Sequence, residues 1–488
     1  MLSILIVMSD TARDSLKEKL LQLQCHFTWN LQIEDVEWDD LQERLNYTIE
    51  ADIVQYKIMP YNLLTFVNCV RNKCEKAFDK LWEAEEILRK DHKSDVEKWS
   101  IVTYGNAAWV YYHVGEVAEA QSYLDKLERI CQQFPGASRF TAMTAEVYGE
   151  KGWSMLRFGW KYYEEANECI EKALEADPDN IEWNTAHATS LFRNKQIFGD
   201  PQLLEHCKVV KQLYRALALN PNDPFLKVML ALRLQQFNQM GESRRLLEEV
   251  IVSSPDDPYL IQYTAKALRK EGSVDRSLEM LKKALMGRPN SGLLHHQIGL
   301  CYRNKLSEMK KTSHRYLAHE ERKRLIELCK YHFQTAYDQK PSLVSAIVDL
   351  AELFAECKDY YKTDEIYENQ LRNKDCNHIN RQLIHWKYGL HQLNRKGSVQ
   401  NAIYHFKECL KLKLNSRTEG YCQATLKKIA EDRLAEHSRD SVAFGILGLI
   451  HQLDGKKSEA IEFFERALEC DCNNEEFQSA LRELKESA

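Results

Sequence analysis

A 34-residue repeat constrains the fold of this chain more than any other feature of its sequence. Each copy has a small residue where two helices would cross, a bulky residue four positions later, and a second small residue three after that. A proline follows five positions further on, and Pro221, Pro255 and Pro289 are spaced 34 residues apart. A repeat of this length is one supersecondary unit that buries its apolar face against its neighbours. The chain is therefore predicted to be an all-α solenoid of stacked helix pairs.

The repeat pattern extends towards both ends of the chain. Its period and its order of small and bulky positions are those of the tetratricopeptide repeat, a helix–turn–helix unit. About nine or ten repeats are expected, with irregular copies at 345–370 and 415–440. Complete copies contain Ala166, Ile170, Ala173 and Pro178; Val209, Leu213, Ala216 and Pro221; Ser243, Leu247, Val250 and Pro255; Ser277, Leu281, Ala284 and Pro289; and Cys329, Phe333, Ala336 and Pro341. Partial copies contain Ala77, Leu81 and Ala84; Ala120 and Leu124; Ala402 and Phe406; and Ala460, Phe464 and Ala467.

The composition agrees with a long helical solenoid. With 488 residues the chain is too long for one compact core, and its 18 glycines and 10 prolines are few helix breakers for that length. The net charge of −6 does not indicate nucleic acid, although a solenoid can enclose a basic channel. The opening MLSILIV is too short for a signal peptide or a membrane span. The 14 cysteines include no C-x-x-C pair, so reduced thiols in the cytosol are expected.

Two departures from the period help to divide the chain into predicted regions. The interval from Pro178 to Pro221 is nine residues too long, and the interval from Pro289 to Pro341 is 18 too long. The second surplus falls in a basic stretch, which is expected to form an extended helix or an extra loop. Such irregularity favours a clamp-like solenoid around a basic central tunnel. The predicted regions are an N-terminal helical segment at 1–58 that contributes to the ligand pocket, N-terminal repeats at 59–255, central repeats at 256–341 with the basic insertion at 303–328, and C-terminal repeats at 342–488.

The first helix of each tetratricopeptide pair lines the concave surface of the stack. Counting from the prolines places Tyr259, Gln262, Lys266 and Arg269 on the inward face of the helix at 259–270, with Tyr263 beside them. Aromatic rings alternating with cations suit a flat, anionic ligand such as nucleic acid. The same count gives further inward residues, which are Lys270, Glu182, Thr185, Thr189, Phe192, Arg193, Phe225, Val228, Leu232, Gln235, Gln236, Leu293, His296, Leu300, Arg303 and Asn304.

The charges on this predicted inner face are unbalanced. Five or six cations face inward in these repeats, and Glu182 is the only inward carboxylate among them. Like charges would strain an empty groove, and a phosphate-bearing ligand would relieve that repulsion. Two plainer interpretations remain, namely a solvated basic face, or arginines that pair with carboxylates from the next repeat.

Four sequence motifs resemble those of a known family. They are CHFTW at 25–29, TYGNAAWVYYHVG at 103–115, EKGWSMLRFGWKYY at 150–163 and LLHHQIGLCYR at 293–303. In this order, on a tetratricopeptide framework, they closely resemble the interferon-induced proteins with tetratricopeptide repeats over essentially the whole chain. The resemblance implies a cytosolic innate-immune protein of antiviral defence that is not an enzyme and needs no cofactor. Such a protein would hold the 5′ end of foreign single-stranded RNA, a triphosphate or a cap lacking ribose methylation, in a basic tunnel. It would thereby sequester the RNA and inhibit viral translation and replication.

The resemblance also implies roles for individual residues. Those matching the family's 5′-end site are Arg44, Trp153, Arg157, Tyr163, Glu182 and Arg193, with Thr48 standing where a glutamine is usual. Those matching the RNA path are Tyr259, Tyr263, Lys266, Arg269, His296 and Gln297, with Gln262 in place of an arginine. The count from the prolines adds Phe225 and Arg303 to the path. No catalytic residue and no metal ligand is expected.

Departures from the family pattern leave the choice between triphosphate and cap open. Arg157 stands where a lysine is usual, and Asp52 stands at an apolar position of the cap loop. There is also a conflict of register, because counting back from the proline places Lys151 and Met155 inward instead of Trp153 and Arg157. We follow the resemblance here, since WSMLRFGWKYYEE is atypical for a repeat and would lengthen its first helix.

Two other classes of protein are considered. A tetratricopeptide protein-interaction scaffold without end-specific RNA recognition is the alternative, although the paired asparagines and lysines of a carboxylate clamp are missing from the inward positions. An enzyme is disfavoured because the sequence has no phosphate-binding loop, dinucleotide fingerprint, zinc-protease motif or nucleophile elbow. The expected partners are therefore the RNA end and, through the C-terminal repeats, a second copy or another family member, with no membrane.

Overall fold

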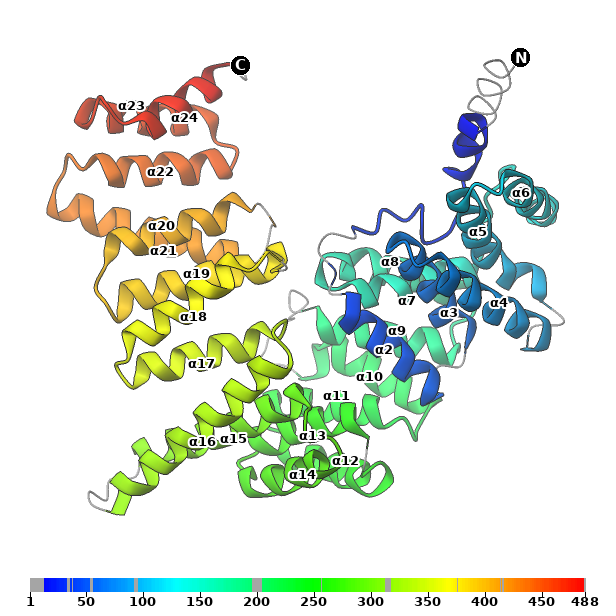
Figure 1. Cartoon of the computed structure of the whole chain (residues 1–488), viewed down its shortest axis with the longest axis horizontal. Coiled ribbons are helices and arrows are strands. Elements are labelled where there is room, and N and C mark those ends of the chain that lie inside the picture. The colour runs from blue at the N-terminus through cyan, green and yellow to red at the C-terminus, as the bar shows by residue number, and fades with distance from the viewer. Residues whose placement is uncertain are drawn as a thin grey trace. The chain divides into compact units, whose positions relative to one another are not determined.

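The computed structural model describes residues 13–486 apart from 33–35, 37, 53–55, 92–94, 195–203, 256, 312–316, 375, 413 and 415–416. Within this part of the chain every regular element is a helix (Figure 1), and the sole β contact is an isolated bridge between Ser138 and Thr141. The all-α class is confirmed. None of the described helices is long and apolar enough to cross a membrane.

The chain forms two compact units, which we call unit 1 (Met1–Gly287) and unit 2 (Arg288–Ala488). Their boundary falls inside the predicted central region, 256–341. Each unit has its own cores, built from the apolar faces of its helix pairs. The clamp-like shape and the central tunnel stay predictions.

Unit 1 consists of consecutive helix pairs preceded by a short helix at 13–20 and by the separate helix α2 (Trp38–Glu50). The pairs are α3 (Ile58–Val70) with α4 (Cys74–Asp91), α5 (Val96–Val114) with α6 (Val117–Cys131), α7 (Ala145–Phe158) with α8 (Tyr163–Ala176), α9 (Ile181–Arg193) with α10 (Lys208–Leu219), α11 (Pro224–Leu234) with α12 (Met240–Ser253), and α13 (Pro258–Lys270) with α14 (Val274–Gly287). Short 3₁₀ turns, η2 (Trp160–Tyr162), η3 (Leu204–His206) and η4 (Gln235–Phe237), join some of them.

Unit 2 continues the pairing with longer helices. Its pairs are α15 (Gly292–Lys311) with α16 (Leu317–Gln339), α17 (Val344–Glu356) with α18 (Tyr360–Arg372), α19 (His378–Asn394) with α20 (Val399–Lys411), and α22 (Ser441–Leu453) with α23 (Lys457–Cys470). The basic stretch at 303–328 lengthens α15 and α16 to 20 and 23 residues, with 312–316 outside the described residues. The irregular copy at 415–440 contains one long helix, α21 (Arg417–Glu436), and α24 (Glu475–Glu486) ends the stack.

The repeat pattern builds the cores in the way the sequence predicts. The second helix of each pair buries its bulky residue completely, as Ile170 of α8, Leu213 of α10 and Leu247 of α12 show with 0% exposure. The repeat prolines lie in the turns between pairs, where the missing backbone N–H costs nothing. Gly152 lets α7 approach α8 closely, because a Cβ at this position would lie 2.6 Å from the Ile170 side chain. The repeat thus determines how closely α7 packs against its partner.

Two first helices of unit 1 begin with the same capping device. The Asp223 carboxylate accepts a hydrogen bond from the backbone N–H of Leu226 at 3.0 Å, which caps α11. The Asp257 carboxylate accepts from the N–H groups of Tyr259 and Leu260 at 2.9 and 3.0 Å, which caps α13. A proline follows each aspartate at the first helical position, where its fixed backbone angle suits the helix. These caps determine where the inward-facing helices start.

The CHFTW motif forms part of a buried polar network in unit 1. The Nε2 atom of His26 lies 2.9 Å from Ser154 Oγ of α7, and its Nδ1 lies 3.1 Å from Asn106 Nδ2 of α5. Asn62 of α3 donates to Glu150 Oε1 of α7 at 2.8 Å. Burial lowers the pKa of His26 to about 3 and raises the pKa of Glu150 to about 8. Both side chains are therefore neutral near pH 7, and they tie α7 to the core of unit 1.

Candidate nucleic-acid interface

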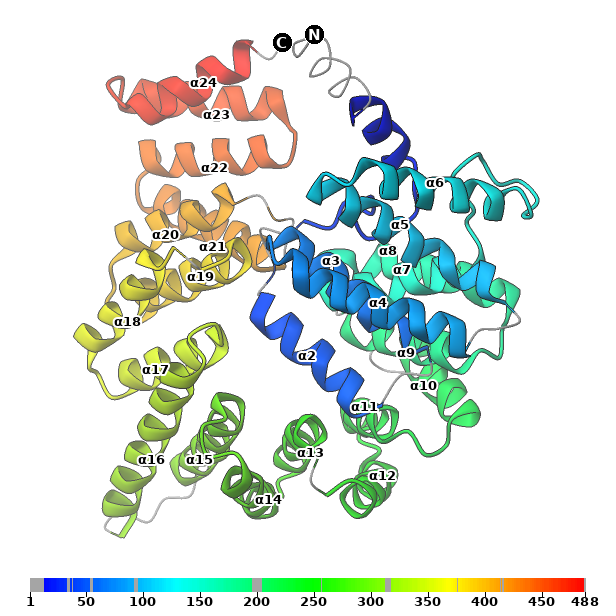
Figure 2. The same ribbon diagram turned by 45° about the vertical axis from the view of Figure 1, so that its right-hand side comes forward.

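A pocket of about 290 Å³ in unit 1 brings together most of the predicted site residues of that unit. It is formed by α2, α7, α9, α11 and α13, and Figure 2 shows α2 running diagonally across unit 1. The predicted residues that line it are Arg44 and Thr48 of α2, Trp153 and Arg157 of α7, Glu182 and Arg193 of α9, Phe225 of α11, and Tyr259 and Tyr263 of α13.

Trp153 and Arg157 lie one turn apart on α7 and touch each other. The guanidinium carbon of Arg157 is 4.4 Å from the centroid of the Trp153 ring, a cation–π contact, and Trp153 is 3% exposed. Met155 is completely buried, and Lys151 pairs with Glu165 at 2.9 Å. The placement by resemblance is therefore confirmed, and the count from the proline is wrong in α7.

The electrostatic environment of Arg157 is unusual for an arginine. Its Nε atom is buried and has no hydrogen-bond partner among the described residues. Burial, followed by the cations of Arg193 and Arg44, lowers the pKa of Arg157 to about 9, and Glu182 opposes this shift. Arginine normally holds its proton far above that value, so the charge is poorly compensated. An anion in the pocket would supply the missing compensation.

The other two arginines of the pocket keep donors available. Arg44 Nε is 3.0 Å from Asp40 Oδ2, one turn earlier on α2. Arg193 Nη1 donates to the backbone carbonyl of Leu156 at 3.4 Å. A guanidinium has five N–H donors, and one contact leaves the rest able to bind oxygen atoms of a ligand. Three guanidinium groups therefore converge on one pocket.

The count from the prolines is confirmed in α9. All five residues that it places inward line the pocket, namely Glu182, Thr185, Thr189, Phe192 and Arg193. In α11 the count from the prolines is correct for Phe225 and Val228, which line the pocket. In α13 it holds for Tyr259, and Tyr263 lies beside it in the pocket wall as expected. The count is therefore right throughout α9 and only in part for α11 and α13, because Leu232 and Gln235 of α11 are buried and do not line the pocket.

Four predicted residues of unit 1 are not among those that line the pocket. Tyr163 begins α8, packs partly buried against the core, and accepts a hydrogen bond from Ser190 Oγ on its carbonyl at 3.2 Å. Gln262, Lys266 and Arg269 lie on α13 beyond the pocket, with Lys266 exposed and the other two partly buried. Their roles stay predictions.

His296 and Arg303 belong to unit 2, where both are paired with carboxylates. Arg303 contacts Asp349 Oδ1 at 2.6 Å and contacts Glu352 Oε2 and Glu356 Oε1 at 3.0 Å each. His296 is 5% exposed, and its Nε2 is 2.7 Å from Asp349 Oδ2. The expectation of unpaired inward cations is wrong here, because the helix after Pro341, α17, presents three acids along one face. Gln297 adjoins His296 on α15 and is partly buried.

The pocket also contains residues that the sequence did not single out. Tyr47 follows Arg44 by three positions and adjoins Thr48, so their shared helical face could have revealed it. Asp223 caps α11 and also lines the pocket, and burial raises its pKa. Glu182 is therefore not the sole inward carboxylate. Local sequence could predict the cap at Asp223 but not its place in the pocket wall.

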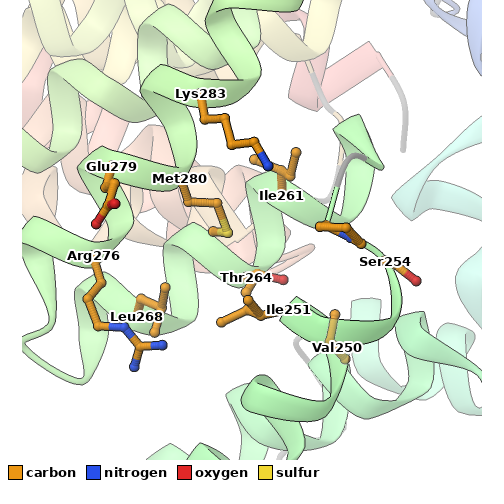
Figure 3. A pocket seen from close by; sticks show the side chains of 11 residues that line it. Val250, Ile251, Ser254, Ile261, Thr264, Leu268, Arg276, Glu279, Met280 and Lys283 are labelled. Carbon is orange, nitrogen blue, oxygen red and sulfur yellow. The ribbon is translucent and has the colours of Figure 1, made fainter.

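A second cavity of about 230 Å³ is lined by residues of α12, α13 and α14 (Figure 3). Ile261, Thr264 and Leu268 of α13 line that cavity together with residues of α12 and α14. The two cavities share no lining residue. Arg44, Arg157 and Arg193 thus line the first pocket and not this second cavity.

Fold and pocket together define a tetratricopeptide-repeat protein with a cationic, aromatic pocket built on its first helices. The sequence model of the tetratricopeptide repeat matches residues 145–180, which contain α7 and α8, and residues 443–471, which contain most of α22 and all of α23. The antiviral innate immune response effector IFIT1 of Macaca fascicularis is 37% identical over 464 residues, covering 93% of this chain and 95% of that protein. The human interferon-induced protein with tetratricopeptide repeats 2 is 33% identical over 469 residues, covering 95% and 97%. The chain belongs to the family of interferon-induced proteins with tetratricopeptide repeats.

Solved structures agree with this assignment. The human IFIT1 dimer with m7Gppp-AAAA has a TM-score of 0.69 and 37% identity, covering 93% of this chain and 99% of that one. The human IFIT1 dimer with PPP-AAAA has a TM-score of 0.67 with the same identity and coverage.

Proposed function

We propose that the pocket of unit 1 binds the 5′ end of foreign single-stranded RNA, and that the protein thereby sequesters such RNA from viral translation and replication. The observation that carries this proposal is the poorly compensated charge of Arg157, which lies beside Arg44 and Arg193 in an aromatic pocket. A 5′ triphosphate concentrates negative charge within a short length and would neutralise three guanidinium groups.

The relatives support this proposal. IFIT1 is an antiviral innate immune response effector, and solved structures of human IFIT1 contain either m7Gppp-AAAA or PPP-AAAA. We infer that this chain likewise acts in the cytosol, as an interferon-induced protein of innate immunity without a catalytic role.

Each part of the pocket would have a separate task. Arg44, Arg157 and Arg193 would bind the phosphates, while Tyr259 and Tyr263 would stack on the first bases. Glu182, Thr48 and Trp153 would surround the terminal group, and Tyr163 would support that end from α8. Gln262, Lys266 and Arg269 would contact the RNA beyond the pocket.

A competition assay tests the proposal. Short RNAs of one sequence are compared with a 5′ triphosphate, a cap lacking ribose methylation, a ribose-methylated cap and a 5′ hydroxyl. The triphosphate RNA is expected to bind at least 100-fold more tightly than the hydroxyl RNA. Its affinity should fall with salt with a log–log slope of about −2, since three neutralised phosphates release counterions. Equal affinity for the triphosphate and hydroxyl RNAs would refute recognition of the end and favour the protein-interaction scaffold.

We also propose that the C-terminal repeats of unit 2 mediate self-association or association with another family member. The human IFIT1 structures are described as dimers, which supports this expectation. Light scattering of the full chain, alone and after removal of α22 to α24, would measure the effect. The same number of copies per particle before and after that truncation would contradict the proposal.

A further inference from the structure

The helix α2 differs from the other helices of the pocket because it belongs to no helix pair. It contributes Arg44, Tyr47 and Thr48 to the pocket wall. Leu41 and Leu45, which are completely buried, anchor α2 to the core of unit 1. One of the three arginines of the pocket, Arg44, therefore lies on a helix outside the repeat stack.

Tyr47 connects α2 to the start of α13, which lies 210 residues further along the chain. Its hydroxyl donates a hydrogen bond to Asp257 Oδ2, and its ring centroid is 4.2 Å from that of Tyr259. The other oxygen of Asp257 accepts the capping hydrogen bonds from the N–H groups of Tyr259 and Leu260. One carboxylate therefore caps α13 and fastens α2 to it.

Electrostatics oppose the position that α2 holds. Its Arg44 lies close enough to Arg157 that, after burial and Arg193, it helps to lower the pKa of Arg157. Without an anion, this repulsion favours movement of α2 away from the pocket. A hydrogen bond to an ionised acceptor is strong enough to offset part of that repulsion, yet weak enough to break on binding and release.

We propose that Tyr47 and Asp257 are positioning residues that fasten α2 across the pocket and so set the rates at which a ligand enters and leaves it. The proposal rests on the proposed function for the identity of the ligand. When the contact breaks, Arg44 and Thr48 move with α2, because both lie on that helix within one turn of Tyr47. A bound anion removes the repulsion, so ligand and contact stabilise the same closed position.

Two substitutions break the contact from opposite sides. Tyr47→Phe keeps the ring beside Tyr259 and removes the hydroxyl. Asp257→Ser keeps a good helix cap and is too short to reach Tyr47. The matched control is Tyr214→Phe, which removes a tyrosine–glutamate contact of 3.0 Å between α10 and α12, away from the pocket.

The first measurement is the kinetics of a short 5′-triphosphate RNA binding to the full chain. Both Tyr47→Phe and Asp257→Ser are expected to raise the dissociation rate about tenfold and to raise the association rate as well. The double variant should dissociate no faster than either single variant, since both remove the same contact. The control should leave both rates unchanged. Rates equal to wild type in the two pocket variants, or an equal change in the control, would overturn the proposal.

The second measurement needs no ligand. Hydrogen exchange of the free protein should become faster in peptides covering 38–50 in both pocket variants, while peptides from α9 stay unchanged. Unchanged exchange in α2 would overturn the fastening. Faster exchange, in a protein that does not distinguish triphosphate from hydroxyl RNA, would support the fastening and refute the proposed function.

Discussion

Arg157 of unit 1 and Arg303 of unit 2 lie on corresponding first helices of their repeats but have opposite surroundings. Arg157 meets two further arginines, and its buried Nε has no partner in the described part of the chain. Arg303 meets Asp349, Glu352 and Glu356 at hydrogen-bond distance. Burial opposes the charge of both. The carboxylates outweigh burial and raise the pKa of Arg303, whereas neighbouring cations lower the pKa of Arg157 further.

This difference shows how to distinguish a ligand site from a structural ion pair on a solenoid. An inward cation does not mark a site, because the next first helix can supply its partner, as α17 does for Arg303. A cation that burial and neighbouring cations both disfavour needs an external anion instead. The difference supports the ligand site proposed for unit 1, and it favours a structural role for Arg303.

The largest effect is expected from Arg193→Glu. This change reverses one of three converging charges and should weaken binding of 5′-triphosphate RNA at least 100-fold, about 3 kcal/mol. The melting temperature should stay the same or rise, because a repulsion with Arg157 disappears. Fluorescence anisotropy and circular dichroism measure the two quantities. Arg245→Glu, at an exposed position of α12, is the matched control for net charge. An equal loss in the control would assign the effect to overall charge and contradict the comparison.

Arg303→Gln should give the reverse result, a loss of stability with little change in RNA affinity. Three carboxylates would face one another without their shared cation, and unit 2 should lose about 2 to 3 kcal/mol of unfolding free energy. Affinity for triphosphate RNA should change less than twofold. Urea unfolding and the binding assay above check this pair of outcomes. A large loss of affinity with unchanged stability would place Arg303 on the RNA path, as the count from the prolines predicts.

A smaller effect is expected when the pH is lowered. Burial lowers the pKa values of His385 and His405 of unit 2 to about 4, and their Nδ1 atoms lie 3.2 Å apart. The unfolded histidines bind protons below about pH 6.5, so stability present above that pH is lost as the pH falls towards 4. Unit 2 should therefore lose about 2 kcal/mol between pH 7.5 and 5.5.

Unit 1 contains a group that acts in the opposite direction. The pKa of Glu150 is raised to about 8, so its contribution to stability is full below the unfolded value and is lost as the pH rises through 8. Glu150 therefore stabilises unit 1 when the pH is lowered. His26, with a pKa of about 3, offsets part of that gain in stability. Hydrogen exchange at pH 7.5 and 5.5 should show protection falling more in unit 2 than in unit 1. The reverse order would contradict these assignments.

Much of the fold could be predicted because its determinants are local and repeated. The period of 34 residues places Ile170, Leu213 and Leu247 at buried crossings, and it orients α9 so that Glu182 and Arg193 line the pocket. The period did not predict α7 correctly, where the family motif did. The stretch around Trp153 departs from the repeat, so a count from the proline could not find its inward face.

The sequence by itself determined the all-α class, the helix pairs and the inward face of α9, because each depends on residues within about one repeat of one another. Only the tertiary structure decided which inward charges are compensated and which contact joins α2 to α13. Arg303 meets Asp349 across 46 residues and Tyr47 meets Asp257 across 210. Such contacts depend on the stacking of separate helices, which no local pattern specifies.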